Sequence, residues 1–427
     1  MKSLDFSNAF VQAKLPDDMP VFAHLPRGFR SMIETQTGAR AALRMKKSIY
    51  GMAVAPRLWH EHLVKGLKKL GFQQSKHDNC LFFKKDHLLV VYVDDCGLSC
   101  RIPSDVDKFV SQLRALGFEL EIEGDFTAFL GVAIEHRDDG SIHMHQRGLI
   151  KKILKAAKME DCKGNWTPAS AAGLGSDPDG ETFGNEPWNY QSIVGALLYL
   201  CTNTRPDISM AVSQVSRFNK NPKKSHATAV KMILRYLKQT MNMGIIIRMN
   251  NELNIKCFAD AAFADGVRAD DIRNPDTARS RGGCIVYFCG IPIFWKSWLM
   301  TAICLSTLEA EHQCLSKAMT EVIAFKHLVE ELVEIFNLPT LTSSISTTVF
   351  EDNQGALLLA TNQRVTSRTK YFHVKWHHFW NHVSEDDGKD GKTVLKKVDT
   401  VLQDADYFTK PLVREPFESN RFRVQGW

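Results

Sequence analysis

Two groups of acidic residues in this sequence have the types and spacing of metal-binding carboxylates. The first centres on Asp94 and Asp95, which lie in a run of apolar residues from Leu89 to Cys100 and resemble the tip of a hairpin. Adjacent carboxylates repel and are costly to desolvate, so apolar strand-forming neighbours favour a divalent cation that neutralises the pair. Asp5 lies in another apolar run, and three carboxylates could share two magnesium ions. A solvated turn is the alternative for the dipeptide alone.

The second group includes a glutamate on a long predicted helix over 309–336. Glu311 lies four residues before Leu315 and shares the apolar face of this helix, whereas Glu309 is expected to point away from it. An unpaired carboxylate on an apolar face would be protonated or destabilising. We therefore expect a metal ion or another cation beside Glu311.

Three aspartates complete the second group. Asp260 ends a strand predicted over 255–260, and Asp352 ends a strand predicted over 347–352. Asp352 directly precedes a predicted helix, so a plain N-cap is the alternative to a metal ligand. Asp406 lies in a short C-terminal helix and by itself indicates nothing.

The elements that would position these acids follow from apolar periodicity. A helix over 56–70 has a proline in its first turn and Gly71 as its stop. Residues 161–187 are rich in Gly, Ser, Asp and Pro, as in a linker. Two or three helices are predicted over 190–237, and the alternation of strands and helices after residue 250 indicates an α/β domain.

Composition excludes several classes of protein. The chain has 427 residues, of which 44% are hydrophobic and 24% charged, values typical of folded globular domains. No run approaches the roughly 18 apolar residues of a membrane helix, and the N-terminus lacks the apolar region of a secretory signal. Ten cysteines without C-x-x-C spacing support neither a disulfide framework nor a zinc site. The net charge of +6 is compatible with a polyanionic partner.

Motifs around the first acids resemble the reverse transcriptase of copia-type LTR retrotransposons. They occur in the family's order: Leu4-Asp5-Phe6-Ser7-Asn8-Ala9-Phe10, Lys47-Ser48-Ile49-Tyr50-Gly51, Ala55-Pro56-Arg57-Leu58-Trp59, Tyr92-Val93-Asp94-Asp95 and Phe129-Leu130-Gly131-Val132. The resemblance implies that Asp5, Asp94 and Asp95 hold the metals of two-metal phosphoryl transfer to a primer end. It also implies that Tyr50 and Gly51 lie beside the incoming nucleotide.

Two departures from this family concern the polymerase. Ala53-Val54 stands where the family usually has Lys-Gln, which removes a cation and an amide near the nucleotide. Asp5 lies at the extreme N-terminus, so the fingers segment that should precede it is missing. We therefore expect a truncated polymerase domain with impaired DNA synthesis.

Motifs around the second group resemble the ribonuclease H of the same retrotransposons. They are Phe258-Ala259-Asp260-Ala261-Ala262-Phe263-Ala264, Leu305-Ser306-Thr307-Leu308-Glu309-Ala310-Glu311, Glu351-Asp352-Asn353-Gln354 and Ser367-Arg368-Thr369-Lys370-Tyr371-Phe372-His373-Val374. The resemblance implies that Asp260, Glu311, Asp352 and Asp406 bind the metals for hydrolysis of the RNA strand of RNA–DNA hybrids. One departure is Arg279-Ser280-Arg281-Gly282-Gly283, where the family usually has Lys-Ser-Thr-Ser-Gly.

A basic and aromatic cluster follows the last of these motifs. It could lie along a phosphate backbone or be only a solvated face. Its histidines are not accompanied by a cysteine pair, which disfavours a zinc site. The members are Arg364, Arg368, Lys370, His373, Lys375, His377 and His378.

These observations predict an α/β (α+β) chain with a partial reverse-transcriptase palm and thumb, a helical connection and a C-terminal ribonuclease H-like mixed sheet with helices. The expected divisions are a truncated palm and thumb at 1–160, a linker and connection at 161–250, a ribonuclease H-like domain at 251–412 and a tail at 413–427.

The resemblance also implies cofactors and partners. Each active site would use two Mg²⁺ or Mn²⁺ ions, and the partners would be an RNA template, a DNA primer, deoxynucleoside triphosphates, an RNA–DNA hybrid and the rest of the Pol polyprotein, with no membrane. The expected location is intracellular, in a cytoplasmic particle or the nucleus. A non-catalytic nucleic-acid-binding remnant is the alternative. A transposase or integrase is a third interpretation, but the Tyr92-Val93-Asp94-Asp95 hairpin has no place in one.

Overall fold

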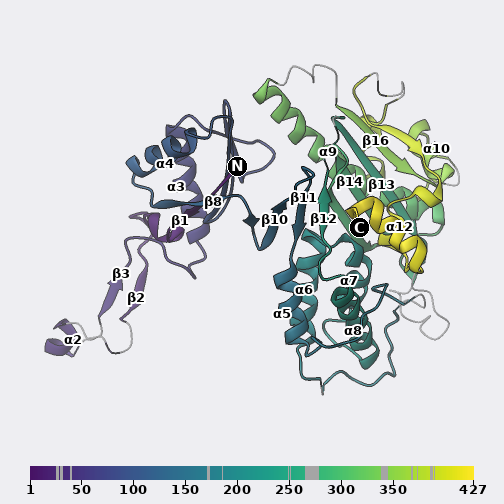
Figure 1. The fold of residues 1–427 in the computed structure, drawn as a ribbon, viewed down its shortest axis with the longest axis horizontal. Coiled ribbons are helices and arrows are strands. Elements are labelled where there is room, and N and C mark those ends of the chain that lie inside the picture. Colours follow the sequence, from purple (N-terminus) through teal and green to yellow (C-terminus); the bar gives the residue numbers. More distant parts are fainter. Residues whose placement is uncertain are drawn as a thin grey trace. The chain divides into compact units, whose positions relative to one another are not determined.

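The computed structural model divides into two compact units (Figure 1). Unit 1 contains residues 1–130 and 334–336, and unit 2 contains residues 131–333 and 337–427. The structure describes the chain except for residues 26–27, 29–31, 39–40, 171–173, 185, 249, 251, 265–277, 338–344, 367–368, 373, 385–387 and 389. Among the described residues, no helix has both the length and the apolar character to cross a lipid bilayer.

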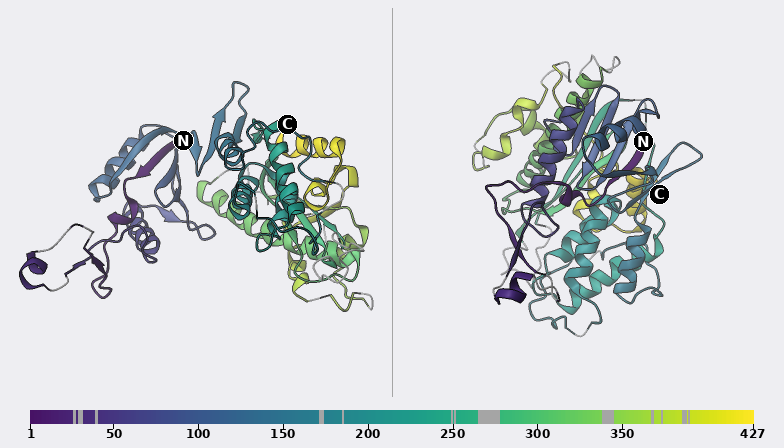
Figure 2. Two further views of the ribbon diagram at one scale, coloured as in Figure 1. Left: turned by 90° about the horizontal axis from the view of Figure 1, so that it is seen from below. Right: turned by 90° about the vertical axis from the view of Figure 1, so that its left-hand side faces the viewer.

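Unit 1 is built on a six-stranded antiparallel sheet with the order β4-β5-β6-β7-β1-β8. Its strands are β1 (Lys2–Phe6), β4 (Gln73–Gln74), β5 (Leu81–Lys84), β6 (His87–Tyr92), β7 (Asp95–Cys100) and β8 (Leu120–Asp125). Two short strands, β2 (Phe22–His24) and β3 (Ala42–Arg44), form a separate hairpin that, with α2 (Met32–Thr37), extends away from this sheet (Figures 1 and 2). The chain of unit 1 ends with β9 (Ala128–Phe129).

Three helices of unit 1 share an apolar cluster with the strands of this sheet. They are α1 (Ala9–Gln12), α3 (Ala55–Lys69) and α4 (Asp105–Ala115). The helix predicted over 56–70 is confirmed as α3, and its apolar stripe is buried against β1, where the rings of Phe6 and Trp59 meet edge to face at 5.1 Å. Burial of these aromatic side chains holds β1, and therefore Asp5, in place between β7 and β8.

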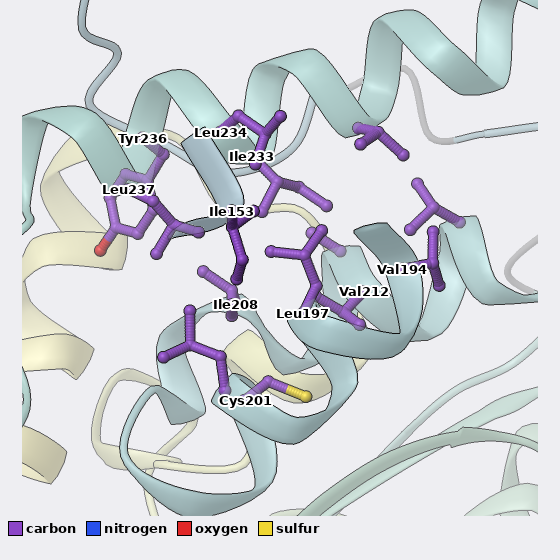
Figure 3. Packing of buried hydrophobic residues seen from close by; sticks show 14 of the residues in the cluster. Ile153, Val194, Leu197, Cys201, Ile208, Val212, Ile233, Leu234, Tyr236 and Leu237 are labelled. Carbon is purple, nitrogen blue, oxygen red and sulfur yellow. The ribbon is translucent and has the colours of Figure 1, made fainter. Parts of the chain in front are cut away.

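A helical core occupies the first part of unit 2. It contains α5 (Arg147–Ala156), α6 (Tyr190–Asn203), the 3₁₀ turn η1 (Pro206–Ile208), α7 (Ser209–Ser216) and α8 (Lys224–Gln239). In the chain, β10 (Val132–His136) and β11 (Ile142–His145) precede these helices and β12 (Ile245–Ile247) follows them, and the three strands pair in antiparallel order. Figure 3 shows Ile153, Leu197, Val212 and Ile233, one from each of the four helices, converging in this core. Each of these side chains is buried, which confirms the helices predicted over 190–237.

A buried ion pair joins distant parts of this core. The guanidinium of Arg205 lies 2.8 Å from Asp207, and the hydroxyl of Tyr236 in α8 donates to the same carboxylate at 2.6 Å. Arg421 in turn donates to the Tyr236 hydroxyl at 3.1 Å. Arg205 and Asp207 are 0% and 1% exposed, so each charge depends on the other for stabilisation.

The second part of unit 2 is a five-stranded mixed sheet with the order β15-β14-β13-β16-β17. β13 is antiparallel to β14 and parallel to β16, and β17 continues the parallel part. The elements are β13 (Asn254–Ala262), β14 (Arg281–Phe288), β15 (Ile291–Leu299), α9 (Thr307–Phe336), β16 (Ser346–Glu351), α10 (Gln354–Asn362), η4 (Val374–His377), η5 (Trp380–His382), β17 (Val394–Lys397), η6 (Thr400–Leu402), α11 (Asp406–Thr409) and α12 (Arg414–Gln425).

Both faces of this sheet are covered. Cys257 and Ala259 of β13 share one apolar cluster with Leu315 of α9, while Ile285 of β14 shares another with Phe408 of α11 and with the helical core. Alternate residues of a strand point to opposite faces, so β13 and β14 are buried between two layers of helices. This arrangement places strand ends, the start of α9 and α11 around one part of the sheet.

The observed elements agree with the predicted mixed α/β class. The strands predicted over 255–260 and 347–352 are observed as β13 and β16, and the long helix is observed as α9. The expected boundaries at 160 and 250 stay predictions, and one apolar cluster contains residues from both sides of each. The segment expected only as a tail, 413–427, contains α12, whose Phe417 and Val424 are buried in the same cluster.

Candidate active sites

The first acids lie on neighbouring strands of unit 1. Asp5 of β1 is directly opposite Asp95 of β7, and the amide of Phe6 donates to the carbonyl oxygen of Asp94 at 3.1 Å. Tyr92 pairs with Asp95, so Val93 and Asp94 form the tip of the β6–β7 hairpin, as predicted. Among the described residues, however, the carboxylate oxygens of these three aspartates do not all lie within 4.8 Å of one another.

The hairpin tip is held in an unusual backbone conformation. Val93 has a φ angle of 59°, a region that a β-branched residue rarely adopts. Trp59 of α3 donates a hydrogen bond from Nε1 to the carbonyl oxygen of Val93 at 2.8 Å. Strained backbone persists where the surroundings fix it, so the motif that contains Trp59 positions the turn beside Asp94 and Asp95.

Strand β8 adds acids that the sequence analysis missed. Glu121 is directly opposite Asp5, and Glu123 accepts a hydrogen bond from the hydroxyl of Ser3 at 2.9 Å. Burial and then the charges of Asp94, Glu123, Asp95 and Glu121 raise the pKa of Asp5. The sequence does contain a signal for these acids, because apolar residues and acids alternate from Leu120 to Glu123, as in a strand with one acidic face. The concentration of negative charge favours a bound cation here.

Tyr50 and Gly51 lie in a turn near these acids. The Tyr50 ring is 52% exposed and its centroid is 4.7 Å from that of Phe10. Burial and then the charges of Asp94 and Asp5 raise the pKa of the Tyr50 hydroxyl. Gly51 has a φ angle of 95°, which glycine adopts without strain. An exposed aromatic face next to the carboxylates is thus available to a ligand.

The second group of acids is gathered more tightly. Asp260 of β13, Glu311 of α9 and Asp352, which follows β16, each offer an oxygen that lies within 4.8 Å of the other two. Asp260 and Glu311 are both 4% exposed, and Asp352 is half-buried. The sequence prediction that Glu311 points inward is therefore confirmed.

Asp406 lies beside this group. Its carboxylate is 2.8 Å from the ammonium of Lys410, and the hydroxyl of Thr409 donates to Asp260. Burial alone would lower the pKa of Lys410, but the charges of Asp260 and Asp406 raise it above its ordinary value. Helix α11 thus brings one acid, one cation and one hydroxyl to the cluster.

Electrostatics indicate that the negative charge of the cluster exceeds the positive charge that Lys410 supplies. Burial, followed by the charge of Asp406, raises the pKa of Asp260 to about 6. Burial and then the charges of Glu351, Asp260 and Asp352 raise the pKa of Glu311 well above its usual range. Oε2 of Glu311 is buried and has no hydrogen-bond partner among the described residues. Clustered oxygen donors with an unpaired buried oxygen fit the preference of Mg²⁺ or Mn²⁺.

Two glutamates near the cluster differ from the expectations. Glu351 is 0% exposed and is the largest charge acting on Glu311, although nothing in the strand pattern singled it out. Glu309, expected to point away from the apolar face, is only 7% exposed; its Oε2 accepts a hydrogen bond from the amide of Leu305 at 2.8 Å. The amide of Glu309 donates to the hydroxyl of Ser306 at 3.2 Å, so Ser306 caps α9 and the Glu309 carboxylate binds the chain that precedes the helix.

The N-cap interpretation of Asp352 is wrong. Asn353 caps α10, because its side-chain oxygen accepts hydrogen bonds from the amides of Gly355 and Ala356 at 2.9 and 3.1 Å. Asp352 instead accepts a hydrogen bond from the hydroxyl of Thr400 at 3.0 Å. Its carboxylate is therefore free to take part in the acidic cluster.

The basic and aromatic cluster is only partly described. Arg368 and His373 lie outside the described residues, whereas Lys370 and Lys375 are exposed. His377 packs against α9, with its Nδ1 3.0 Å from Nε2 of His312. His378 lies 3.3 Å from the hydroxyl of Ser316 on the same helix. The histidines therefore contact α9, and the lysines face solvent.

Comparisons with known proteins identify the family. Residues 1–171 match the family model "Reverse transcriptase (RNA-dependent DNA polymerase)". This segment of the chain includes Asp5, Tyr50, Gly51, Asp94 and Asp95. Over 98% of its length the chain is 31% identical to the retrovirus-related Pol polyprotein from transposon RE1 of Arabidopsis thaliana. The chain is homologous to Pol polyproteins of copia-type retrotransposons.

Two other relatives in this family have similar coverage. The Pol polyproteins from transposon RE2 of A. thaliana and transposon TNT 1-94 of Nicotiana tabacum are 30% and 28% identical to the chain, each over 98% of it. The chain spans 27% of the RE1 and RE2 polyproteins and 30% of the TNT 1-94 polyprotein. This copia-type chain therefore corresponds to one part of those longer proteins.

Proposed function

We propose that this copia-type chain is an RNA-directed DNA polymerase with a ribonuclease H activity. The observation that carries the proposal is the buried cluster of Asp260, Glu311 and Asp352 in a chain whose first 171 residues match a reverse transcriptase model. Burying three acids without a cation is strongly unfavourable, so their retention in one place is best explained by a metal-dependent reaction.

The proposed polymerase site comprises Asp5, Asp94 and Asp95. Their carboxylates would hold two Mg²⁺ or Mn²⁺ ions, which when bound activate the attacking 3′-oxygen and neutralise the triphosphate. The close pairing of Asp5 with Asp95 and the raised pKa of Asp5 support this role. Tyr50 and Gly51 would bind the incoming deoxynucleoside triphosphate, with the exposed Tyr50 ring as a stacking surface.

The proposed nuclease site comprises Asp260, Glu311, Asp352 and Asp406. These carboxylates would hold two divalent ions, whose chemistry is to activate water and stabilise the leaving oxygen of a phosphodiester. Thr409 orients Asp260 through its hydrogen bond. Burial raises the pKa of Asp406, and Lys410 opposes this rise and places positive charge beside the site.

The substrates follow from these two sites. We propose an RNA template with a DNA primer for synthesis, an RNA–DNA hybrid for cleavage, and a role within a longer Pol polyprotein inside the cell. The exposed side chains of Lys370 and Lys375 supply positive charge that would contact phosphates.

Cleavage of a labelled RNA–DNA hybrid tests the nuclease. The full chain should cut the RNA strand in Mg²⁺, and Glu311→Gln should remove cleavage because a metal-binding charge is lost. Glu309→Gln is the matched control two residues earlier on α9, since a glutamine oxygen can still accept the Leu305 amide. Loss of cleavage in E309Q but not in E311Q would contradict the assignment. An inactive wild type would favour a non-catalytic remnant.

Primer extension on a poly-rA template tests the polymerase. Extension should require Mg²⁺ and should be lost in Asp94→Asn. Asp86→Asn is the matched control, because Asp86 lies at the other end of β6, near Arg101, with a 3.6 Å separation between the charged atoms. Equal loss in D86N and D94N would show that the effect comes from the fold and not from the proposed site.

A further inference from the structure

The β10–β11 hairpin of unit 2 gathers a second group of potential metal ligands, away from the acidic sites. Glu135 of β10 is directly opposite His143 of β11, and His145 is opposite Ala133. Directly paired residues, and residues two apart on one strand, share a face of the sheet. Glu135, His143 and His145 therefore project from the same face.

Distances within this group bring three potential ligand atoms together, and a bound ion would replace the hydrogen bond between Glu135 and His145. Oε1 of Glu135 lies 2.7 Å from Nε2 of His145, and Oε2 lies 3.4 Å from Nδ1 of His143. One ligand atom from each residue lies within 4.8 Å of the other two. A tetrahedral zinc ion with ligands at about 2.0–2.1 Å requires donor separations of roughly 3.3 Å.

Both histidines are buried, and both ring nitrogens of His145 have protein partners, namely Glu135 and the amide of Arg147. His143 and His145 are 1% and 6% exposed. Nε2 of His143 is buried without a hydrogen-bond partner among the described residues, and its ring lies 5.2 Å from that of Trp427. Nδ1 is the nitrogen of His143 that faces Glu135, so the unpartnered Nε2 points away from Glu135 and is a position for a buried water.

The remaining surroundings leave room for an ion to bind from one side. Glu135 is exposed, so its carboxylate can move and a water could complete the coordination. Arg147 lies 3.3 Å from Oε2 of Glu135 and competes for this oxygen, but its side chain is 37% exposed and can swing into solvent.

We propose that Glu135, His143 and His145 bind one divalent transition-metal ion of the zinc class. Two imidazoles and one carboxylate suit zinc, whereas magnesium prefers an all-oxygen set. The ion would connect β10 to β11 and fix this hairpin against the C-terminal residues. This site is independent of the proposed polymerase and nuclease activities.

Cobalt(II) is the probe for this site, because its visible absorption reports tetrahedral binding. The full chain is titrated with Co²⁺ in excess Mg²⁺, which occupies the acidic clusters. One equivalent should bind with a visible band and should be displaced by Zn²⁺. His145→Asn and Glu135→Gln should each weaken binding by more than about 100-fold, since even changes behind the ligands cost about 10- to 100-fold.

His136→Asn is the matched control, because His136 is an exposed histidine on the same hairpin but on its other face. The E135Q variant guards against misfolding, since this side chain is exposed. Zn²⁺ should also raise the melting temperature of the wild type and of H136N but not of H145N. Arg147→Ala should tighten binding, because a competing cation is removed.

Several results would overturn the proposal. They are the absence of a stoichiometric band in the wild type, a band that survives in E135Q and H145N, or an equal loss in H136N. A stoichiometric band that depends on Glu135 and His145 but not on His136 would support it.

Discussion

Replacing Asp260 with asparagine should stabilise the metal-free protein at neutral pH. The change keeps the size of the side chain and its ability to accept a hydrogen bond from Thr409, but it removes one charge from the acidic cluster. Burial and the charge of Asp406 raise the pKa of Asp260 from 3.8 to about 6. This difference corresponds to about 3 kcal/mol of free energy.

The sign follows from proton binding. Because the folded protein holds the Asp260 proton more tightly than the unfolded chain, the wild type loses about 1.4 kcal/mol of stability per pH unit between 3.8 and about 6. The asparagine variant does not titrate and escapes this loss. The two proteins should therefore have similar stability near pH 4, and the variant should be more stable by about 3 kcal/mol at pH 7.

Urea unfolding measured by tryptophan fluorescence in EDTA, from pH 4 to pH 7.5, tests this expectation. Mg²⁺ should then raise the unfolding midpoint of the wild type at pH 7 and have little effect on D260N, because a ligand is lost. A variant that is less stable than the wild type at every pH, with a constant gap, would refute the conclusion that the clustered acids repel one another.

Two further substitutions test features that position the sites. Trp59→Phe removes the hydrogen bond to Val93, which is worth about 1 kcal/mol. Primer extension should slow by roughly 10- to 100-fold, because small displacements of catalytic groups are costly. An unchanged rate in the folded variant would show that this bond does not position the turn. Asp207→Ala removes the ion-pair partner of the buried guanidinium of Arg205. The free energy of unfolding, measured by urea denaturation, should fall by about 3–5 kcal/mol. A loss below about 1 kcal/mol would mean that water reaches the pair.

Periodicity in the sequence was sufficient to place the main elements. The apolar stripe that predicted a helix over 309–336 corresponds to α9, and its phase correctly turned Glu311 inward. The same reasoning assigned Glu309 to the opposite side, where it would be solvated. Glu309 is buried because the chain before α9 folds back and the Leu305 amide donates a hydrogen bond to its carboxylate. Periodicity within a helix carries no information about a segment that lies before the helix.

Other parts of the sites depend on contacts between distant residues. Glu351 could not be distinguished from its neighbour Asp352, because the sequence shows two adjacent acids at a strand end but not which one the sheet buries. The N-cap of α10 was considered only for Asp352, but the backbone direction after β16 gives this role to Asn353. The pairing of Glu121 with Asp5 depends on strand register across more than a hundred residues, which no local pattern encodes.

The apolar cluster that joins α5–α8 to the five-stranded sheet has a consequence for cooperativity and for dissection of the chain. Ile285 and Phe408 share their burial with the helices that precede the sheet, and Phe417 of α12 packs into the same cluster. A fragment beginning near residue 251 would expose this face and would be prone to aggregate, whereas one beginning at residue 131 would retain it. Helices that bear none of the proposed catalytic acids thereby become folding partners of the nuclease sheet, and the two should melt in a single transition.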